Sequence, residues 1–311
     1  MKTEKIILFG ASKVTKKILN YEPRENVDVL FICDNNSSLW GETISGIEIV
    51  SPERIKSVIF DRIILCFING TFLCDVYDQV LDMGIDKEKI ILSHSADTLG
   101  YVKSPLEEFF IIPSKTGTSF VRQPAIIKEV YEGETKRCNE RRSREGFFEK
   151  YCNGEGLDIG YGSDPIMPSV YGWDIENGDA QYLNGVSDES LDYVYSSHCL
   201  EHLWDVRLAI KNWFRVIKRG GHLIIAVPHR DLYEKKKTLP SRWNGDHKHM
   251  FLIGRAESPD TLDIVEEVRE GLMNFDYDIE YVKTCKEGYE DLGERIHSKG
   301  EYQIEMVIRK K

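Results

Sequence analysis

The first 95 residues alternate between short apolar runs and amphipathic stretches. Each apolar run has the length of a strand, and turn residues such as Gly10 or Asn69 follow it. Strands that alternate with helices predict a doubly wound parallel sheet, hence an α/β fold. The expected strands are 5–9, 27–33, 61–68 and 89–93, and the expected helices are 13–21 and 72–84.

The turn after the first strand lies where a dinucleotide-binding fold would bind its nucleotide. Asp34 ends the second strand about two dozen residues after Gly10, where a dinucleotide-binding fold has its ribose-binding acid. The turn itself reads Gly10, Ala11, Ser12, although the nucleotide fingerprint requires further glycines for close approach to a pyrophosphate. Three roles therefore remain open for this half: NAD chemistry, docking or sugar-nucleotide recognition, and no ligand role at all.

The second half restarts the same pattern. An apolar run ends in the sequence Asp158-Ile-Gly-Tyr-Gly162, and a second run ends in Asp174. A helix is expected over 203–218, and it is expected to end at Gly220-Gly221, because glycine suits a helix C-cap. Further strands are expected at 190–197, 222–229, 277–288 and 300–311. We predict domains at 1–95 and 140–311, with a linker at 96–139.

The composition and charge of the chain argue against several classes of binding partner. The chain has 311 residues and a net charge of -11, which argues against general affinity for nucleic acid or an anionic membrane. Seven cysteines without a Cys-x-x-Cys pair indicate neither a disulfide framework nor a thiolate zinc site. No apolar stretch approaches the about 20 residues of a membrane span. We expect a cytoplasmic protein without membrane insertion, and a homodimer is the oligomeric state to test.

Four blocks of the second half carry a family resemblance. "LDIGYG", "WDIENGDAQYL", "SLDYVYSSHCLEHL" and "WFRVIKRGGHLIIAVPH" resemble class I S-adenosylmethionine-dependent methyltransferases of the type 11-like group over residues 140–311. The resemblance implies a Rossmann-like domain with an antiparallel last strand and S-adenosylmethionine as cofactor. "ILFGAS", "FICDNN", "LWGETISGIEIVSPE" and "MGIDKEKIIL" resemble the Rossmann-like domains attached to surface-polysaccharide enzymes.

The resemblance implies a set of cofactor-binding residues. Asp158 is expected to orient the glycine turn and attract the methionyl ammonium, and Asp174 to accept from the ribose hydroxyls. These aspartates could instead only cap turns or helices. Ser163-Asp164 replaces the usual third glycine, and Pro165 and Pro168 imply a short or absent first helix. The expected cofactor residues are Asp158, Gly160, Tyr161, Gly162, Asp174, Asp179, Ala180 and Ser197.

The segment "HCLEH" matches a zinc-peptidase pattern, but that pattern requires a long helix. His198 instead follows an expected strand. Two interpretations remain: Glu201 and His202 stabilise a helix start, or they bind a divalent metal as in related RNA and ubiquinone-pathway enzymes. The metal set would be His198, Glu201, His202 and His247, with His249 as the alternate for His247. Three imidazoles favour zinc, manganese, iron or cobalt over magnesium.

Without a metal, an imidazole has to remove the acceptor's proton. The candidate bases are His198, His229 and His247. Arg141, Arg142 or Arg144 could reach the site towards a carboxylate or phosphate. The segment 230–251 has the length of a lid, and its basic and aromatic side chains suit a phosphorylated sugar. They are Arg230, Lys235, Lys236, Lys237, Arg242 and Trp243.

The predicted function is methyl transfer from S-adenosylmethionine to an oxygen of a small carbohydrate, sugar-phosphate or phosphoramidate precursor in surface polysaccharide biosynthesis. One alternative is a nucleotide-sugar oxidoreductase that uses the first domain. The other is a non-enzymatic module that binds S-adenosylmethionine. The first alternative predicts NADH binding, and the second predicts cofactor binding without turnover.

Overall fold

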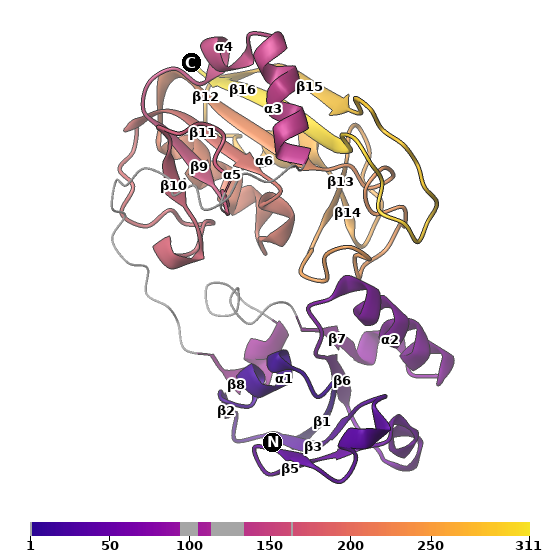
Figure 1. Ribbon diagram of the computed structural model, residues 1–311. Helices are drawn as coiled ribbons and strands as arrows, with labels where there is room; N and C mark the ends of the chain where they lie inside the picture. The colour runs from indigo at the N-terminus through magenta and orange to yellow at the C-terminus, as the bar shows by residue number, and fades with distance from the viewer. Residues whose placement is uncertain (1, 94–104, 113–133, 163) are drawn as a thin grey trace. The chain divides into compact units, whose positions relative to one another are not determined.

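The structure is a computed structural model that describes residues 2–93, 105–112, 134–162 and 164–311. The chain forms two compact units, which Figure 1 shows with their elements. Unit 1 is Met1–Lys115 with Pro240–His247, and unit 2 is Thr116–Leu239 with Lys248–Lys311. Most of the predicted linker at 96–139 lies outside the described residues. The segment Pro240–His247 packs with unit 1, although the range predicted for the second domain includes it.

Unit 1 contains a six-stranded sheet in the order β4-β5-β3-β1-β6-β7. All its neighbouring pairs are parallel except β4 with β5, which is antiparallel. Alternate residues of β1 enter two different cores, Ile6 and Leu8 on one face and Ile7 and Phe9 on the other. A sheet covered on both faces confirms the doubly wound α/β fold.

The bounds of unit 1's elements are as follows. The sheet consists of β1 (Glu4–Phe9), β3 (Val27–Cys33), β4 (Thr43–Ile44), β5 (Ile47–Val50), β6 (Arg62–Leu65) and β7 (Ile90–Leu92). The helices are α1 (Lys13–Ile18) and α2 (Gly70–Asp82), and β2 (Glu22–Pro23) pairs with β8 (Phe110–Ile111). Both helices start at a polar cap, since Ser12 and Asn69 each accept two backbone amides of the first turn.

Unit 2 contains a second six-stranded sheet, in the order β10-β9-β11-β12-β16-β15. The first four strands are parallel, whereas β16 is antiparallel to both of its neighbours. This topology confirms the predicted fold with an antiparallel last strand. The carboxyl ends of the parallel strands share one edge of the sheet, where an open α/β sheet binds its ligands.

The strands of that sheet are β9 (Gly156–Ile159), β10 (Tyr171–Trp173), β11 (Leu191–Ser197), β12 (Ile217–Pro228), β15 (Tyr277–Cys285) and β16 (Gln303–Lys310). The helices are α3 (Glu134–Arg144), α4 (Phe147–Tyr151), α5 (Val206–Arg215) and α6 (Ile264–Gly271). A small parallel pair consists of β13 (Met250–Leu252) and β14 (Thr261–Asp263).

Two connections were singled out by the sequence. The described residues between β9 and β10 form no helix, as the two prolines predicted. The expected end of the helix at Gly220-Gly221 is wrong, because α5 ends at Arg215 and β12 runs through both glycines. A Cβ on Gly221 would collide with the Asp192 carbonyl oxygen, so this glycine allows close packing within the sheet instead of capping a helix. Within the described part of the chain, no helix is long and apolar enough to cross a bilayer.

Candidate cofactor pocket and histidine cluster

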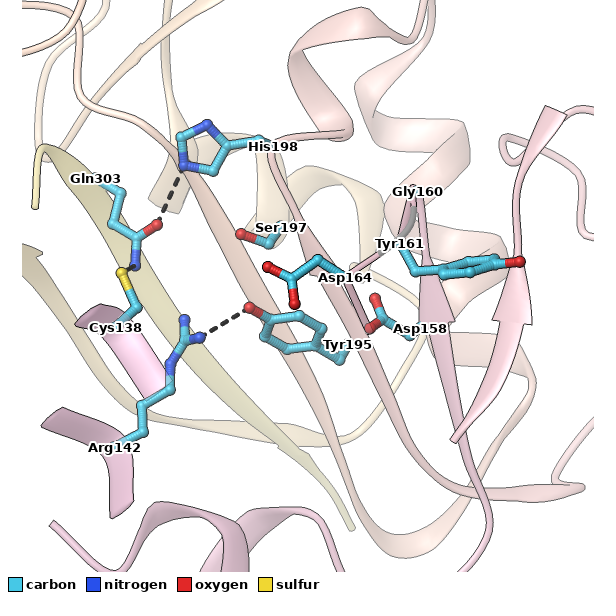
Figure 2. Close-up of a pocket in the computed structure, with 10 residues that line it drawn as sticks. All are labelled: Cys138, Arg142, Asp158, Gly160, Tyr161, Asp164, Tyr195, Ser197, His198 and Gln303. Carbon is cyan, nitrogen blue, oxygen red and sulfur yellow. Dashed lines mark hydrogen bonds between the residues drawn. The ribbon is translucent and has the colours of Figure 1, made fainter. Parts of the chain in front are cut away.

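A cavity of about 130 Å³ opens at the carboxyl ends of β9 and β11 in unit 2. It is smaller than the about 300–1,000 Å³ of a site that holds a whole drug-sized ligand, so it suits one end of a larger molecule. Figure 2 shows the ten residues that line it. Five were predicted: Asp158, Gly160, Tyr161, Ser197 and His198. Five were not assigned to the cofactor from the sequence: Cys138, Arg142, Asp164, Tyr195 and Gln303.

The two glycines of the first turn have different roles. Both have positive φ, +73° at Gly160 and +57° at Gly162, which favours glycine. A Cβ on Gly160 would lie 2.6 Å from the Cβ of Cys199, so this glycine makes room for a neighbouring side chain. A Cβ on Gly162 would meet nothing within 4 Å, and the Gly162 amide donates to Asp174 Oδ2 at 3.0 Å. Gly160 is among the residues that line the cavity, and Gly162 borders open space.

Asp158 is the buried acid of the pocket. Its Oδ2 accepts a hydrogen bond from the Ile166 amide at 2.7 Å. Burial raises the pKa of Asp158 to about 7, against the opposing effects of that hydrogen bond and the nearby Arg142 guanidinium. A cationic ligand group beside Asp158 would favour its ionised form, which is the role predicted for a methionyl ammonium.

The remaining cofactor candidates make structural contacts. Asp174 caps the 3₁₀ turn Ile175–Asn177 through a reciprocal capping box, besides receiving the Gly162 amide. Asp179 accepts from the backbone and side-chain nitrogens of Gln181, and burial raises the pKa of Asp179. The Ala180 carbonyl accepts from the Trp213 indole at 2.8 Å. The capping role considered for the aspartates is therefore present, and their cofactor contacts remain predictions.

Arg142 contributes a buried cation to the pocket from α3. Its Nε donates to Glu305 Oε2 at 2.8 Å, and its Nη1 donates to Asn139 Oδ1 at 3.0 Å and the Tyr195 hydroxyl at 2.9 Å. Its Nη2 is buried and has no hydrogen-bond partner among the described residues, although the side chain is only 1% exposed. In Figure 2, Arg142 and His198 lie on one side of the pocket, and Asp158 and Gly160 lie on the other.

The other two arginines of the predicted basic stretch are used elsewhere. Arg141 forms ion pairs with the buried carboxylates of Glu301 and Glu305, both at 3.0 Å. Arg144 pairs with the exposed Glu287 at 2.5 Å. Of the three candidates, only Arg142 lines the cavity.

His198 begins the segment after β11 in an unusual conformation. Its φ of +52° is uncommon for a residue with a side chain, and such residues cluster at functional sites. Its Nε2 lies 3.1 Å from Gln303 Oε1, while Gln303 Nε2 donates to Cys138 at 3.3 Å. In the tautomer in which Nε2 donates to this amide oxygen, Nδ1 is the ring nitrogen that can accept a proton. The His198 ring also packs edge-on against Tyr233 and Tyr302.

Glu201 and His202 follow on the 3₁₀ turn Leu200–His202. The zinc-peptidase interpretation fails here, because its two histidines require consecutive turns of a long helix. Glu201 is 1% exposed, and its Oε1 lies 3.9 Å from both His198 Nδ1 and His202 Nε2. The Lys248 amide donates to the Glu201 carbonyl at 2.8 Å, which holds the chain immediately after His247 at this place.

Three potential metal ligands lie close together among the described residues. Glu201, His202 and His247 each offer one ligand atom, and these atoms lie within 4.8 Å of one another. The alternate ligand, His249, has its Nε2 3.3 Å from the Trp204 carbonyl oxygen. Burial lowers the pKa of His249, against the opposing effect of its hydrogen bond to the Trp204 carbonyl. The group contains three of the four predicted ligands, without His198, and metal binding itself remains a prediction.

Three further side chains singled out from the sequence are not among those that line the cavity. His229 does not line the cavity: its Nδ1 accepts from the Asp231 amide at 3.2 Å, and burial lowers its pKa. Arg230 is buried and pairs with Asp231 and Glu257, and Lys235 pairs with Asp291 at 2.8 Å. These two basic side chains therefore stabilise the fold of the predicted lid rather than present charge to a ligand.

Comparisons with known proteins agree with the topology. Residues 157–225 match a family model described as a methyltransferase domain. Residues 2–91 match a model described as C2185-like, N-terminal, which does not confirm the surface-polysaccharide type suggested by resemblance. Neither match covers half of the chain. No curated protein sequence matches the chain.

Several solved structures are distantly similar. One is a SAM-dependent methyltransferase from Archaeoglobus fulgidus, with 16% identity, 58% of this chain and 96% of that chain covered, and a TM-score of 0.36. Another, from Thermotoga maritima, is described as a SAM-dependent methyltransferase and possible histamine N-methyltransferase, with 17% identity, 57% and 98% coverage and a TM-score of 0.32. A third concerns conversion of a disulfide bond into a thioacetal group during echinomycin biosynthesis, with 15% identity, 61% and 85% coverage and a TM-score of 0.40.

These TM-scores are too low for the structures to support an argument about this chain. The domain match at 157–225 and the sheet with its antiparallel last strand define the class instead. The chain is an S-adenosylmethionine-dependent methyltransferase, and S-adenosylmethionine is the cofactor expected for it. This match does not define the methyl acceptor, a bound metal or the role of any single residue.

Proposed function

We propose that the chain transfers the methyl group of S-adenosylmethionine to an oxygen of a carbohydrate, sugar-phosphate or phosphoramidate precursor of a surface polysaccharide. The observation that carries oxygen as the acceptor atom is His198, an imidazole at the edge of the cavity whose Nδ1 is the basic nitrogen. A hydroxyl has to lose its proton as it attacks, and an imidazole is the side chain best suited to accept that proton near neutral pH. The carbohydrate and its pathway rest on the sequence resemblance of the first domain.

The pocket fits the methionyl end of the cofactor. An α-amino acid carries a cation and an anion on one carbon, and this pocket has acids on one side and a guanidinium on the other. In the proposal Asp158 binds the ammonium and Arg142 Nη2 donates to the carboxylate, forming a charge-assisted hydrogen bond. Asp174, connected to the glycine turn through the Gly162 amide, accepts from the ribose. The bound cofactor supplies an electrophilic methyl group on sulfonium.

The protein's part in the transfer is to orient the hydroxyl and accept its proton. The acceptor oxygen forms a bond to the methyl carbon, the carbon–sulfur bond breaks, and the hydroxyl proton moves to His198 Nδ1. In the proposal Gln303 Oε1, which lies 3.1 Å from the opposite ring nitrogen, accepts the proton of that nitrogen and so favours this tautomer. Glu201, with Oε1 at 3.9 Å from Nδ1, stabilises the imidazolium that forms.

The activity test uses labelled S-adenosylmethionine with candidate sugars, sugar phosphates and phosphoramidates, followed by mass spectrometry of the product. We expect a methyl group on oxygen and a fall of about 10²–10⁴-fold in kcat for His198→Gln, the usual contribution of a general base. Lys211→Gln, a change on the outer helix α5, is the matched control. Methylation of nitrogen or carbon, or full activity of His198→Gln, would overturn this assignment.

The proposal also includes a divalent metal ion. Glu201, His202 and His247 are the ligands, supported by their mutual distances, and His198 Nδ1 lies near Glu201 as a fourth candidate. Imidazole and carboxylate ligands suit zinc, manganese, iron or cobalt. A bound metal supplies acidification of a coordinated hydroxyl and fixes its orientation.

The metal test is elemental analysis combined with thermal unfolding in zinc, manganese or magnesium. We expect about one equivalent of metal, a higher Tm with zinc or manganese than with magnesium, and loss of both effects in His202→Ala. Unchanged activity of His202→Ala, with no metal raising Tm, rejects the metal while leaving methyl transfer through His198 intact.

The two alternatives predict different binding. In unit 1 the Asp34 carboxylate already accepts from the Ala11 and Asn36 amides, both at 2.7 Å, and a Cβ on Gly10 would lie 2.7 Å from the Phe67 ring. The Asp34 carboxylate is thus engaged by backbone amides and the Phe67 ring lies against Gly10, which argues against a close approach of a dinucleotide to this turn. An NADH fluorescence titration that shows saturable binding would restore it, and cofactor binding without any turnover would favour the non-enzymatic module.

A further inference from the structure

Three aromatic rings lie beside His198 in unit 2. Tyr233 belongs to the segment after β12, whereas His297 and Tyr302 belong to the loop between β15 and β16. The centroids of the three rings lie 5.2 Å from one another, and the His198 ring lies 6.3 Å from both tyrosines. His297 is exposed and Tyr233 is half-buried. These three rings, here called the aromatic wall, are therefore accessible to a ligand next to the candidate base.

The two loops that carry the wall are connected to each other. Lys235 Nζ, in the segment after β12, donates to the Gly293 and Ile296 carbonyls of the other loop, both at 2.9 Å. It also forms an ion pair with Asp291 at 2.8 Å, and its side chain is 5% exposed. The Leu232 carbonyl makes a second connection, because it accepts from two hydroxyl groups of the same loop. The wall therefore has a defined support.

His198 lies between the wall and the cofactor cavity. His198 and Gln303 line the cavity, whereas the three rings of the wall are not among its lining residues. A cofactor in the cavity and an acceptor against the wall would both reach the His198 ring. Methyl transfer requires this arrangement, because donor and acceptor have to be held together at the base.

The charges beside the wall favour an uncharged ligand. Arg230 and Lys235 are the buried basic side chains of the segment after β12, and both form ion pairs with acids. A phosphate bound here would need a cation that is not already paired. The negative face of an aromatic ring instead attracts weakly positive C–H groups. A sugar ring presents C–H groups on one face and hydroxyl groups around its rim.

We propose that the aromatic wall is the acceptor subsite, and that Tyr233 and His297 bind a sugar ring with one hydroxyl directed to His198. Tyr302 is buried and packs against both rings, so it supports them. The inference rests on the proposed function and narrows it. The part of the acceptor next to His198 is a neutral sugar ring, and not a phosphate or a phosphoramidate.

Saturation-transfer NMR of the full chain with bound S-adenosylhomocysteine tests the subsite. The probes are the methyl α-glycosides of glucose, galactose and mannose, which are neutral sugar rings. We expect saturation transfer to the ring protons of at least one glycoside. Its affinity should fall about tenfold in Tyr233→Ala and in His297→Ala, the size of one lost aromatic contact. Tyr233→Phe keeps the ring and should keep most of the signal.

Three controls exclude a general effect of the substitutions. The Kd for S-adenosylhomocysteine and the near-UV circular dichroism should be unchanged in the alanine variants. Phe72→Ala removes a ring that is 62% exposed in unit 1, and it should leave the sugar signal as in the wild type. Inorganic phosphate at the concentration of the glycoside should not displace it.

Three results would overturn the subsite: no transfer to any of the three glycosides, equal transfer in the wild type and both alanine variants, or displacement by phosphate. Methyl transfer is measured separately with labelled S-adenosylmethionine. Sugar binding that depends on Tyr233, without methyl transfer, would count against the proposed function alone. Methylation of a sugar with a wild-type KM in Tyr233→Ala would count against the subsite alone.

Discussion

At the scale of the residue, the pocket contains a buried acid, Asp158, and a buried cation, Arg142, on opposite sides. Asp158 has its pKa raised by burial, and Arg142 has an Nη2 with no hydrogen-bond partner among the described residues. Each group is costly to bury alone, and each would be relieved by the opposite charge of an amino-acid ligand. Ligand binding and stability should therefore respond together to changes at these two positions.

The first prediction concerns Asp158 and pH. Its folded-state pKa, about 7, lies above the ordinary 3.8, so the fold favours the protonated carboxyl. That contribution to stability is present below about pH 4 and is lost as pH rises through 7. The free energy of unfolding of the wild type, measured relative to Asp158→Asn by urea titration, should fall by about 3 kcal/mol between pH 5 and 8. Equal differences at the two pH values would contradict a buried acid.

The same carboxyl should make cofactor binding depend on pH. A ligand ammonium favours ionised Asp158, so binding below pH 7 has to displace a proton first. The wild-type Kd for S-adenosylhomocysteine, measured by calorimetry, should therefore weaken as pH falls from 8 to 6. In Asp158→Asn this dependence should be absent and the affinity low throughout.

A second residue prediction addresses Arg142. Removing one charge-assisted hydrogen bond typically costs about 1.5–3 kcal/mol, or about 10- to 100-fold in affinity. Arg142→Gln should weaken S-adenosylhomocysteine by that factor and leave 5′-methylthioadenosine, which lacks the amino-acid end, unchanged. Near-UV circular dichroism checks the fold, and Arg144→Gln, an exposed neighbour, is the control. Equal losses for both ligands would place Arg142 outside the carboxylate site.

At the scale of the element, α3 is attached to β16 by buried ion pairs. Glu305 is fully buried, which raises its pKa, but the charges and hydrogen bonds of Arg142 and Arg141 outweigh burial and hold this pKa at about 2. This contribution to stability is present above the ordinary pKa of 4.5 and is lost as pH falls towards 2. The same contacts place Arg142 at the cavity, so the element that stabilises the sheet edge also completes the pocket.

Breaking this attachment should be costly. Glu305→Gln leaves two buried guanidinium groups without their shared carboxylate, and removal of one partner from a buried pair costs about 3–5 kcal/mol. Glu53→Gln, which removes an exposed pair with Lys56, should change stability by less than about 1 kcal/mol. Urea unfolding at pH 7 compares the two variants. A loss below 1 kcal/mol in Glu305→Gln would show that α3 is held by its apolar contacts instead.

At the scale of the whole molecule, the two units have separate cores. Two apolar clusters lie on the faces of the first sheet and two others on the faces of the second. The cofactor cavity is lined by residues of unit 2 alone. Ligand binding should therefore stabilise the units unequally.

This gives a prediction for hydrogen exchange with ligand. S-adenosylhomocysteine at about 100 times its Kd stabilises the unit that binds it by about 2.7 kcal/mol. The slowest amides of β11 should exchange about 100-fold more slowly with the ligand, whereas those of β1 should change less than threefold. Equal protection in β1 and β11 would mean that the two units unfold as one cooperative body.

Prediction from the sequence succeeded where the structure depends on interactions between residues that are close in sequence. Apolar runs ending at glycine or aspartate identified both parallel sheets, and the prolines after Asp158 identified the missing helix. It failed at Gly220-Gly221, because a glycine that allows close strand packing has the same local signature as a helix cap. The assignment of Gly160 to the cofactor stays a prediction, and its lack of a side chain also makes room for Cys199, which is distant in sequence.

The sequence by itself determined the fold class, the methyltransferase motifs and five of the ten residues that line the pocket. Tertiary structure alone decided which of three arginines enters the cavity, that Gln303 orients His198, and that Pro240–His247 packs with unit 1. The reason is the range of the interactions. Periodicity, capping and turn chemistry act over a few residues, whereas ion pairs and glycine contacts join positions more than a hundred residues apart, which no local pattern encodes.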